Sequence, residues 1–547
     1  MLAAARGLRA GAAVLMFGAA LAVLVGVPVR GAEQSRARPA GQTTPPRDRA
    51  VPRTPSDPVE QQPTLTAERA EAFVDAARRG LDYLPGEVLV RFKPFVSSAA
   101  RQRALDVLGG RPRLGDVEWH GPVALVRDRT EPNAHVLAHR LRERPEVAYA
   151  EPNHIARVEP RLHERLRAVD PSPAPALAAA VPNDEDFAAY QWNFSLIDMP
   201  GAWEIQPGGR PEIVVAVLDT GVTAASVTRT FRIWTGAAFE DVPMPFAVSD
   251  DLPAARLVGA RDLAFLEPSG PVLDLDGHGT HVAGTIGEST NNLRRLAGMA
   301  YNVRVMPIKV CLGYWEILIA RAQASITGFP PADVGGCLYS DMADGIYYAA
   351  DQGARVMNIS IGGPGASTLL RDALTYAASR GMFVAISMGN DFQNGNTVSF
   401  PARYGQDIQG VMAVGAVGKT SDKAYYSSTG PHCEIAAPGG DGTIGGSPDF
   451  GFVWQTTLDF LDQVPSVIRP RFDRYDKIGY QGTSMAAPHV AGLAALLASQ
   501  SPGMSPASIE RIVRATARDL GAPGRDDFFG YGLIQPRTAL FGRGIRR

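Results

Sequence analysis

The most informative segment of this chain for its fold is Val214-Val215-Ala216-Val217-Leu218-Asp219-Thr220-Gly221. It is a continuous apolar run that ends in a carboxylate and a glycine turn, and such runs form strands buried on both faces of a parallel sheet. Similar apolar runs, separated by helical stretches rich in small residues, occur at 303–310, 356–361, 383–386 and 411–414. The alternation predicts a three-layer α/β fold, in which helices cover both faces of a mostly parallel sheet.

Asp219 stands at the carboxyl end of the first predicted strand. Parallel α/β sheets bind ligands and place catalytic groups at this end of their strands. Taken alone, however, an aspartate in a strand-to-loop turn more often caps nearby backbone N–H groups. A catalytic interpretation of Asp219 therefore depends on other segments.

Two histidines follow in Asp276-Gly277-His278-Gly279-Thr280-His281, at the start of a helical stretch rich in small residues. A zinc site would need a third ligand, and the HExxH arrangement typical of zinc enzymes is absent. The flanking glycines leave His278 accessible to a substrate. We expect His281 to be a structural histidine instead.

Two further segments carry groups suited to stabilising an oxyanion. Ser484 stands in Gly482-Thr483-Ser484-Met485-Ala486, at a loop-to-helix junction where unpaired N–H groups face outward. The predicted strand 383–386 leads to Asn390, whose side-chain N–H suits the same role. The alternatives are a serine N-cap and a turn asparagine. The GxSxG elbow of lipases does not fit, because Ala486 replaces its second glycine.

Asp219, His278 and Ser484 occur in the chain order Asp, His, Ser, which distinguishes subtilisins from chymotrypsins and α/β hydrolases. Together with the strings HGTHVAG and GTSMAAPHVAG, this order makes residues 182–541 resemble the subtilisin-like (S8) serine peptidases. The resemblance implies the three-layer fold of that family. It also implies a serine endopeptidase that forms an acyl-enzyme on Ser484 and needs no cofactor for its chemistry.

The resemblance assigns a role to each candidate residue. His278 is the general base, and Asp219 fixes its tautomer and stabilises the imidazolium. The oxyanion hole consists of the Asn390 side chain and the backbone N–H of Ser484. The implied substrate-binding residues are Ser360, Ile361, Gly362, Gly389, Asp391 and Ser399. Ser399 stands where many relatives have glycine at the base of the S1 pocket, which favours a smaller or more polar P1 side chain.

A smaller unit precedes the peptidase part. Strand-like and helix-like stretches alternate over residues 84–159 in β-α-β-β-α-β order, which predicts a ferredoxin-like α+β domain. This unit resembles the inhibitory propeptide of the same family. We therefore expect the chain's own propeptide to act as an intramolecular inhibitor.

The remaining segments are assigned by composition. Residues 1–32 combine a basic start with an apolar run and predict a signal peptide, although the run is long enough for an uncleaved membrane anchor. Residues 33–83 are predicted to be a disordered linker. Residues 160–181 are predicted to be a second linker that contains the maturation site, and residues 542–547 a tail. The expected location is secreted or extracytoplasmic, with membrane contact only through an uncleaved N-terminal segment.

Composition and charge exclude several classes of protein. The chain is 45% hydrophobic and 20% charged, which is typical of a globular protein. Its three cysteines exclude a disulfide-dense scaffold. Residues 33–181 carry a net charge of +3 and residues 182–547 a net charge of −8, so nucleic acid is not an expected partner of the peptidase part. We expect a monomer that acts on proteins or peptides.

Three insertions depart from the family pattern, at residues 223–255, 312–336 and 458–477, and the sequence assigns no role to them. The second lies between Cys311 and Cys337. In an exported protein this pair predicts a disulfide, with two buried thiols as the alternative. Cys433 would remain free.

Asn291 and Asn292 resemble part of the family's calcium loop. The carboxylate that usually helps close that site is not apparent after Asp219, so structural Ca²⁺ stays an open alternative. Two other functions also stay open. One is a narrow-specificity processing enzyme or exopeptidase of the same family, because the insertions could narrow the cleft. The other is an inactive binding scaffold.

Overall fold

The computed structural model describes residues 64–158, 181–267, 270–443, 451–459 and 469–542, together with the backbone of 166–167. The main sheet has seven parallel strands in the order β17-β16-β15-β13-β6-β10-β9. These strands are β6 (Val214–Asp219), β9 (Arg261–Asp262), β10 (Arg304–Lys309), β13 (Val356–Ile359), β15 (Phe383–Ser387), β16 (Val411–Val417) and β17 (Ile435–Pro438). The predicted parallel sheet is confirmed.

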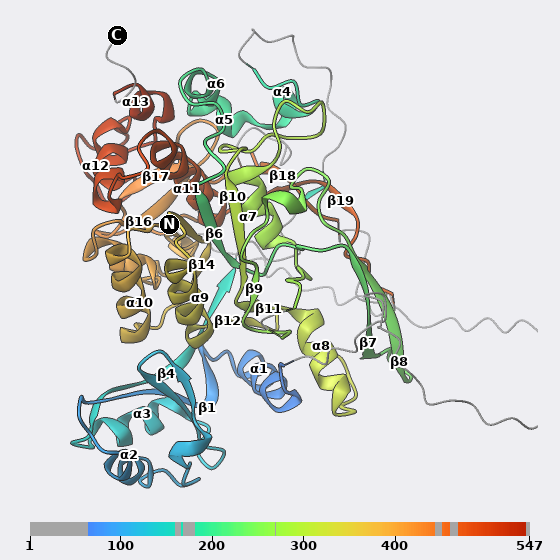
Figure 1. Cartoon of the computed structure of the whole chain (residues 1–547), viewed down its shortest axis with the longest axis vertical. Helices are drawn as coiled ribbons and strands as arrows, with labels where there is room; N and C mark the ends of the chain where they lie inside the picture. The colour runs from blue at the N-terminus through green and yellow to red at the C-terminus, as the bar shows by residue number, and fades with distance from the viewer. Residues whose placement is uncertain are drawn as a thin grey trace, which may run out of the picture. The chain divides into compact units, whose positions relative to one another are not determined.

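β6 lies inside this sheet, and helices cover both of its faces (Figure 1). Because side chains alternate along a strand, Val215 and Val217 pack into one hydrophobic cluster and Ala216 and Leu218 into another. Burial on both sides explains why the strand is apolar throughout. The first cluster includes residues of α7 (His278–Gly287), α11 (Thr483–Gln500) and α12 (Pro506–Thr516), and the second those of α9 (Tyr339–Asp351) and α10 (Thr368–Ser379).

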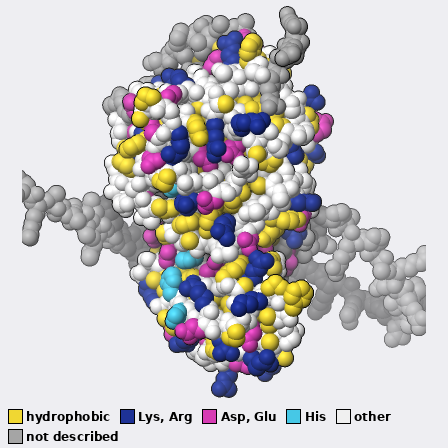
Figure 2. All heavy atoms as spheres, turned by 90° about the vertical axis from the view of Figure 1, so that its left-hand side faces the viewer, with side chains coloured by type: hydrophobic (Ala, Val, Ile, Leu, Met, Phe, Trp, Pro, Cys, Tyr) yellow, Lys and Arg dark blue, Asp and Glu magenta, His cyan; other side chains and the backbone are white. Residues whose placement is uncertain are grey.

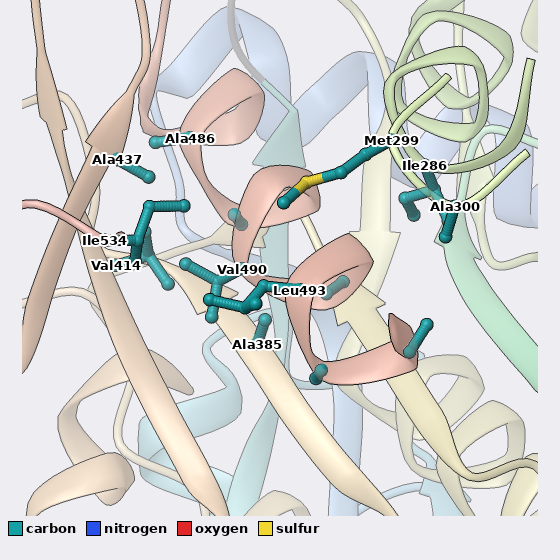
Figure 3. Packing of buried hydrophobic residues seen from close by; sticks show 14 of the residues in the cluster. Ile286, Met299, Ala300, Ala385, Val414, Ala437, Ala486, Val490, Leu493 and Ile534 are labelled. Atoms are coloured by element: carbon teal, nitrogen blue, oxygen red, sulfur yellow. The ribbon is translucent and has the colours of Figure 1, made fainter. Parts of the chain in front are cut away.

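Small residues along α11 let this helix pack closely against its neighbours. Figure 3 shows Val490 and Leu493 of α11 beside Ala385 and Val414 of the sheet. On another side, a Cβ added to Gly492 would lie 2.8 Å from the sulfur of Met299. This close packing fixes the start of α11, which carries Ser484, relative to the sheet.

A second sheet begins in the ferredoxin-like unit. Its strands are antiparallel in the order β4-β1-β3-β2, with α2 and α3 inserted between them in the sequence, and this confirms the predicted β-α-β-β-α-β order. The elements are β1 (Tyr83–Phe92), α2 (Ser98–Leu105), β2 (Glu118–His120), β3 (Val123–Arg127), α3 (Ala134–Arg142) and β4 (Val147–Val158).

The end of β4 extends into the peptidase part and pairs there with two short strands. On one side it pairs with β12 (Gly336–Leu338), and on the other with β14 (Ile361–Gly362), both antiparallel. The ferredoxin-like unit and the peptidase part therefore share one sheet through β4.

Helix α1 (Ala67–Arg79) corrects the prediction of a linker over residues 33–83. The side chain of Thr66 caps its start, and Gly80 ends it in the left-handed conformation at φ +63°. Ala70, Phe73 and Val74 are buried, because they recur on one face and pack against the peptidase part. The linker prediction is wrong for residues 67–83, since this burial offsets the entropy lost on ordering.

The first two insertions contain defined elements, and residues 460–468 of the third lie outside the described residues. The first contains the antiparallel hairpin β7 (Val227–Trp234) and β8 (Phe239–Phe246). The second begins after Cys311, which the structure joins to Cys337 by a disulfide, and contains α8 (Tyr314–Gln323). The third lies between the paired strands β18 (Val453–Leu458) and β19 (Tyr475–Tyr480).

Several predicted segments lie outside the described residues. They are the signal peptide at 1–32, the first part of the linker, most of the second linker and the last five residues of the tail. Among the helices that the structure describes, none is long and apolar enough to cross a membrane.

Candidate active site

The carboxyl end of β6 and the start of α7 bring Asp219 and His278 together. Nδ1 of His278 lies 2.7 Å from Oδ1 of Asp219, and both side chains are fully buried. The expectation that His278 is accessible is therefore wrong for this structure. The contact with Asp219 places the imidazole proton on Nδ1, so that Nε2 carries the lone pair that a general base needs. Gly279 permits the close approach, because a Cβ there would lie 2.3 Å from the carbonyl oxygen of Gly221.

Asp274 connects the two chain segments that carry this pair. Its carboxylate accepts hydrogen bonds from the hydroxyl of Thr220 at 3.1 Å and from the hydroxyl of Thr280 at 2.6 Å. It also accepts the backbone N–H groups of Asp276 and Gly277 at 3.0 and 2.8 Å. Burial raises the pKa of Asp274. The sequence analysis missed this residue, although an aspartate between Leu273 and Leu275 in an apolar stretch is a usable signal.

His281 has a different environment. Its Nε2 lies 3.2 Å from the carbonyl oxygens of Val453 and Ile478. Its ring stacks on that of Tyr480, with the centroids 4.1 Å apart. Both contacts are with residues of the protein interior, which agrees with the structural role expected for His281.

Ser484 is the second residue of α11 and is almost fully buried. Its hydroxyl donates to the carbonyl oxygen of Ser360 at 3.1 Å, and the hydroxyl of Ser360 donates to the carbonyl oxygen of Ser484 at 2.7 Å. Four residues earlier, the ring of Tyr480 lies 6.4 Å from that of His278, centroid to centroid. The chain thus brings serine and histidine into one region, while the serine hydroxyl bonds to Ser360.

Asn390 follows β15 and lies beside the start of α11. Its Oδ1 accepts hydrogen bonds from the backbone N–H and the hydroxyl of Thr483, both at 2.9 Å. These bonds fix the orientation of the amide, and Asn390 lines the same cavity as Ser484. An amide held by its oxygen can present its N–H groups to a ligand.

The cavity beside Ser484 has a volume of about 820 Å³. On the wall of the cavity, Ser399 packs against two glycines. A Cβ added to Gly362 would lie only 2.2 Å from the hydroxyl oxygen of Ser399, and a Cβ added to Gly389 would lie 3.0 Å from its Cβ. Burial raises the pKa of Asp391, which also lines the cavity. The candidate substrate-binding residues that line it are Gly362, Gly389, Asp391 and Ser399.

The candidate substrate strand pairs with the ferredoxin-like unit. Ile361 is opposite Val158 of β4, and Gly362 is opposite Arg157. The guanidinium of Arg157 donates to the carbonyl oxygens of Asp333 and Gly335, both at 3.3 Å. β4 thus occupies the peptidase strand where the resemblance places an extended substrate.

The calcium candidates Asn291 and Asn292 lie beside two buried carboxylates that the sequence analysis did not connect with them. Asp184 accepts the backbone N–H of Asn291 at 2.8 Å, and Asp251 accepts the Asn292 side chain at 2.6 Å. Oδ2 of Asp251 is buried with no hydrogen-bond partner among the described residues. Burial, together with the nearby charge of Asp184, raises the pKa of Asp251 to about 7. A cation would relieve this repulsion, so the donor set fits calcium.

The described residues contain no cluster of three or more His, Cys, Asp or Glu side chains that could hold a metal ion. A calcium site here would therefore combine the two carboxylates with amide and backbone carbonyl oxygens. Calcium accepts six to eight oxygen ligands of these kinds.

Comparison with known proteins gives two family matches. The model of the Subtilase family matches residues 210–532, and that of the Fervidolysin N-terminal prodomain matches residues 69–153. The first match covers more than half of the chain.

Individual relatives extend these matches. The Thermophilic serine proteinase of Bacillus sp. (strain AK1) is 30% identical over 461 residues, which cover 84% of this chain and 88% of that protein. Fervidolysin of Fervidobacterium pennivorans is 32% identical over 348 residues, which cover 62% of this chain and 42% of fervidolysin. The crystal structure of fervidolysin aligns with a TM-score of 0.56 at 24% identity, over 85% of this chain and 62% of that one, and supports the fold.

Proposed function

Because the chain belongs to the subtilase family, we propose that it is a secreted serine endopeptidase, made as a zymogen, that hydrolyses proteins through an acyl-enzyme on Ser484. The observation that carries the proposal is the buried contact of 2.7 Å between His278 and Asp219. An imidazole oriented in this way can accept a hydroxyl proton at neutral pH.

In the proposed reaction, the Ser484 hydroxyl turns from Ser360 to Nε2 of His278 and gives up its proton. The serine oxygen then bonds to the scissile carbonyl carbon. His278 returns the proton to the leaving amine as the C–N bond breaks, and water repeats both steps to free Ser484. Asp219 stabilises the imidazolium and does not itself accept a proton.

The oxyanion formed in each step is bound by the Asn390 side chain and by the backbone N–H of Ser484. Thr483 holds the amide oxygen of Asn390, which supports an orientation with the N–H groups toward the oxyanion. In subtilisin itself, loss of one such donor costs about 3 kcal/mol. We therefore expect Asn390→Ala to lower kcat by about a hundredfold or more.

The propeptide inhibits by covering the substrate strand through β4. A second contact strengthens its position: Glu151 accepts hydrogen bonds from the Ser367 hydroxyl at 2.6 Å and from the backbone N–H groups of Thr368 and Leu369 at 2.9 and 3.2 Å. A carboxylate at the start of α10 is favoured by the unpaired N–H groups there. The inhibitor thus contacts both the cleft and the helices beside it.

Protein substrates suit the surface better than nucleic acid does. On the face shown in Figure 2, basic and acidic side chains are interspersed. The net charge of −8 over residues 182–547 opposes phosphate binding. Pairing of a substrate with β14 would use backbone groups only, so it would accept many side chains.

Ser399 is proposed to limit the P1 side chain. It lies between the walls formed by Gly362 and Gly389, so the pocket favours small or polar groups over large aromatic ones. Sequencing of the peptides released from a denatured protein would test this. Cleavage mainly after Phe, Tyr or Trp would contradict it.

Structural calcium is proposed at Asp184, Asp251 and Asn292. Bound calcium stabilises the folded state by about 3 kcal/mol at a hundredfold excess over its Kd. We therefore expect chelation with EGTA to lower Tm, and Asp251→Asn to remove this response. The control is Asp250→Asn. Asp250 is the exposed residue next to Asp251 and pairs with Arg294 and Arg295, so this variant should keep the response to EGTA. An unchanged Tm after chelation of the wild-type protein would contradict the site.

The enzyme assignment of Ser484 is tested by covalent labelling. A fluorophosphonate probe should label the activated wild-type protein and should not label Ser484→Ala. Equal labelling of both would place the nucleophile elsewhere, and no labelling of the activated wild type would support an inactive scaffold. Intact mass and N-terminal sequencing of exported material would test secretion and the maturation site.

A further inference from the structure

Helix α1 packs on a peptidase surface that is formed mainly by α8 of the second insertion. Figure 1 shows α1 beside α8, with the β7–β8 hairpin next to α8. Phe73 and Val74 of α1 belong to one buried cluster with peptidase side chains. We call the peptidase side of this contact the helix-docking surface; it comprises Phe265, Ile317, Ala320 and Arg321.

Polar contacts fix α1 on the helix-docking surface at its start and along its length. The backbone N–H and the hydroxyl of Thr64 both donate to the carbonyl oxygen of Phe265, at 2.8 and 3.1 Å. Within the helix, Glu71 forms an ion pair with Arg321. This ion pair joins opposite charges across the contact through charge-assisted hydrogen bonding.

Arg321 is held in place from the peptidase side. Only 5% of its side chain is exposed, and its guanidinium also donates to the carbonyl oxygens of Gly328 and Thr327 at 2.7 and 3.3 Å. A buried guanidinium is costly without a charged partner. When α1 dissociates, Arg321 loses its ion pair with Glu71. Phe265 and Ile317 become exposed to water at the same time. Both changes are unfavourable, so the surface favours the docked helix.

The docked helix also affects the cleft. Gly80, Leu81 and Asp82 follow α1 directly and line the same cavity as Ser484. α1 itself is 13 residues long, which is too short for a stable isolated helix in water. Its helical form, and with it the position of these three residues, therefore depends on the helix-docking surface.

We propose that the helix-docking surface is a binding site for the amphipathic helix α1, and that it retains the propeptide on the peptidase after cleavage within residues 160–181. The ligand class is an amphipathic helix that buries apolar side chains such as Phe73 and Val74 and carries a carboxylate, here Glu71, that pairs with Arg321. This inference rests on the proposed zymogen function. It gives the second insertion a role in binding the inhibitor.

The test measures retention without relying on peptidase activity. A site for an added specific protease is placed between residues 171 and 175 of the full chain carrying Ser484→Ala, and the chain is cut there. Dissociation of the cut propeptide is then followed by size-exclusion chromatography. We expect Glu71→Arg to speed dissociation by about tenfold or more, since it puts two cations together.

The matched control is Glu68→Arg, which makes the same charge change on α1 but removes a contact with Arg129 inside the propeptide. It should dissociate like the parent chain. Arg321→Glu should behave like Glu71→Arg, and the combined Glu71→Arg and Arg321→Glu chain should recover most of the retention. Phe73→Ser, which removes apolar contact without changing charge, should also dissociate faster.

Equal dissociation rates for the parent, Glu71→Arg and Phe73→Ser would overturn the proposal. So would equal acceleration by Glu68→Arg, because that would trace the effect to helix charge and not to Arg321. Failure of the peptidase proposal would appear separately, as an absence of fluorophosphonate labelling in the chain that keeps Ser484.

Discussion

Asp274 illustrates how single residues outside the catalytic set determine its geometry. It joins the turn after Asp219 to the start of α7 by accepting several N–H and O–H groups. Such a buried network is favourable only while its members stay paired, because an unpaired buried donor loses its hydration without compensation. The position of His278 relative to Asp219 therefore depends on the charge of Asp274.

We expect Asp274→Asn to lower kcat by about ten- to a hundredfold. The amide has one acceptor oxygen, so its N–H₂ group would face either the donors of Thr220 and Gly277 or, in the flipped orientation, those of Thr280. Raising the activation free energy by about 1.5 to 3 kcal/mol, through poorer positioning of His278, lowers kcat by about this factor. Steady-state kinetics on a fluorogenic peptide would measure it.

Asp407→Asn is the control, because this carboxylate pairs with Arg403 on the surface. It should leave kcat at the wild-type value. A wild-type kcat in Asp274→Asn would show that Thr220 and the histidine segment hold their positions without that carboxylate.

At the scale of elements, the disulfide stabilises the strand that binds the inhibitor. Cys311 and Cys337 are opposite one another in the β11 (Cys311–Leu312) and β12 pair, and Cys337 is also opposite Ala156 of β4. The bond closes a loop with a sequence separation of 26. Closing such a loop restricts the unfolded chain more than the folded one.

We expect Cys311→Ser combined with Cys337→Ser to lower the free energy of unfolding by about 3 kcal/mol. Denaturation in urea, with and without a thiol reductant, would measure this. Reductant should destabilise the wild-type protein and should have no further effect on the double variant, since Cys433 is already free. Equal responses of the two proteins to reductant would argue against the pairing.

At the scale of the whole molecule, the folded state contains buried histidines that it keeps neutral. Nδ1 of His489 lies 2.8 Å from the carbonyl oxygen of Met485, and its Nε2 lies 2.8 Å from the amide nitrogen of Asn193. One ring nitrogen donates and the other accepts, so the neutral ring satisfies both contacts. Burial lowers the pKa of His489 to about 4, and that of His432 also to about 4.

This shift predicts a loss of stability in mild acid. Below pH 6.5 the unfolded chain takes up a proton on His489, whereas the folded chain does so only near pH 4. The contribution of His489 to the free energy of unfolding is therefore fully present above pH 6.5, and about 3 kcal/mol of it is lost as the pH falls from 6.5 to 4. Thermal unfolding between pH 7.5 and 4.5 would measure the slope.

His489→Gln should flatten this pH dependence, since glutamine does not titrate. His139→Gln, at an exposed position, should keep the wild-type slope. Parallel curves for all three proteins would exclude His489 as the source of the acid sensitivity.

The parallel sheet, the ferredoxin-like unit and the family could all be predicted from the sequence alone. These features are local, because a buried strand must be apolar throughout and the family motifs are contiguous strings. The same applies to candidates such as Asp219, His278 and Ser484, which stand at the ends of strands or the starts of helices. These residues can be identified as candidates from the order of short segments along the chain, which is read from the sequence without a structure.

The contacts between distant segments could not be predicted from the sequence and became visible in the folded chain. The fold brought Asp251 to Asn292, placed Asp274 between Thr220 and Thr280, and packed α1 on α8 where a linker had been predicted. Neither periodicity nor motif spacing encodes such contacts. They arise because buried apolar faces and unpaired polar groups must find partners among whatever segments the fold brings near, at any separation along the chain.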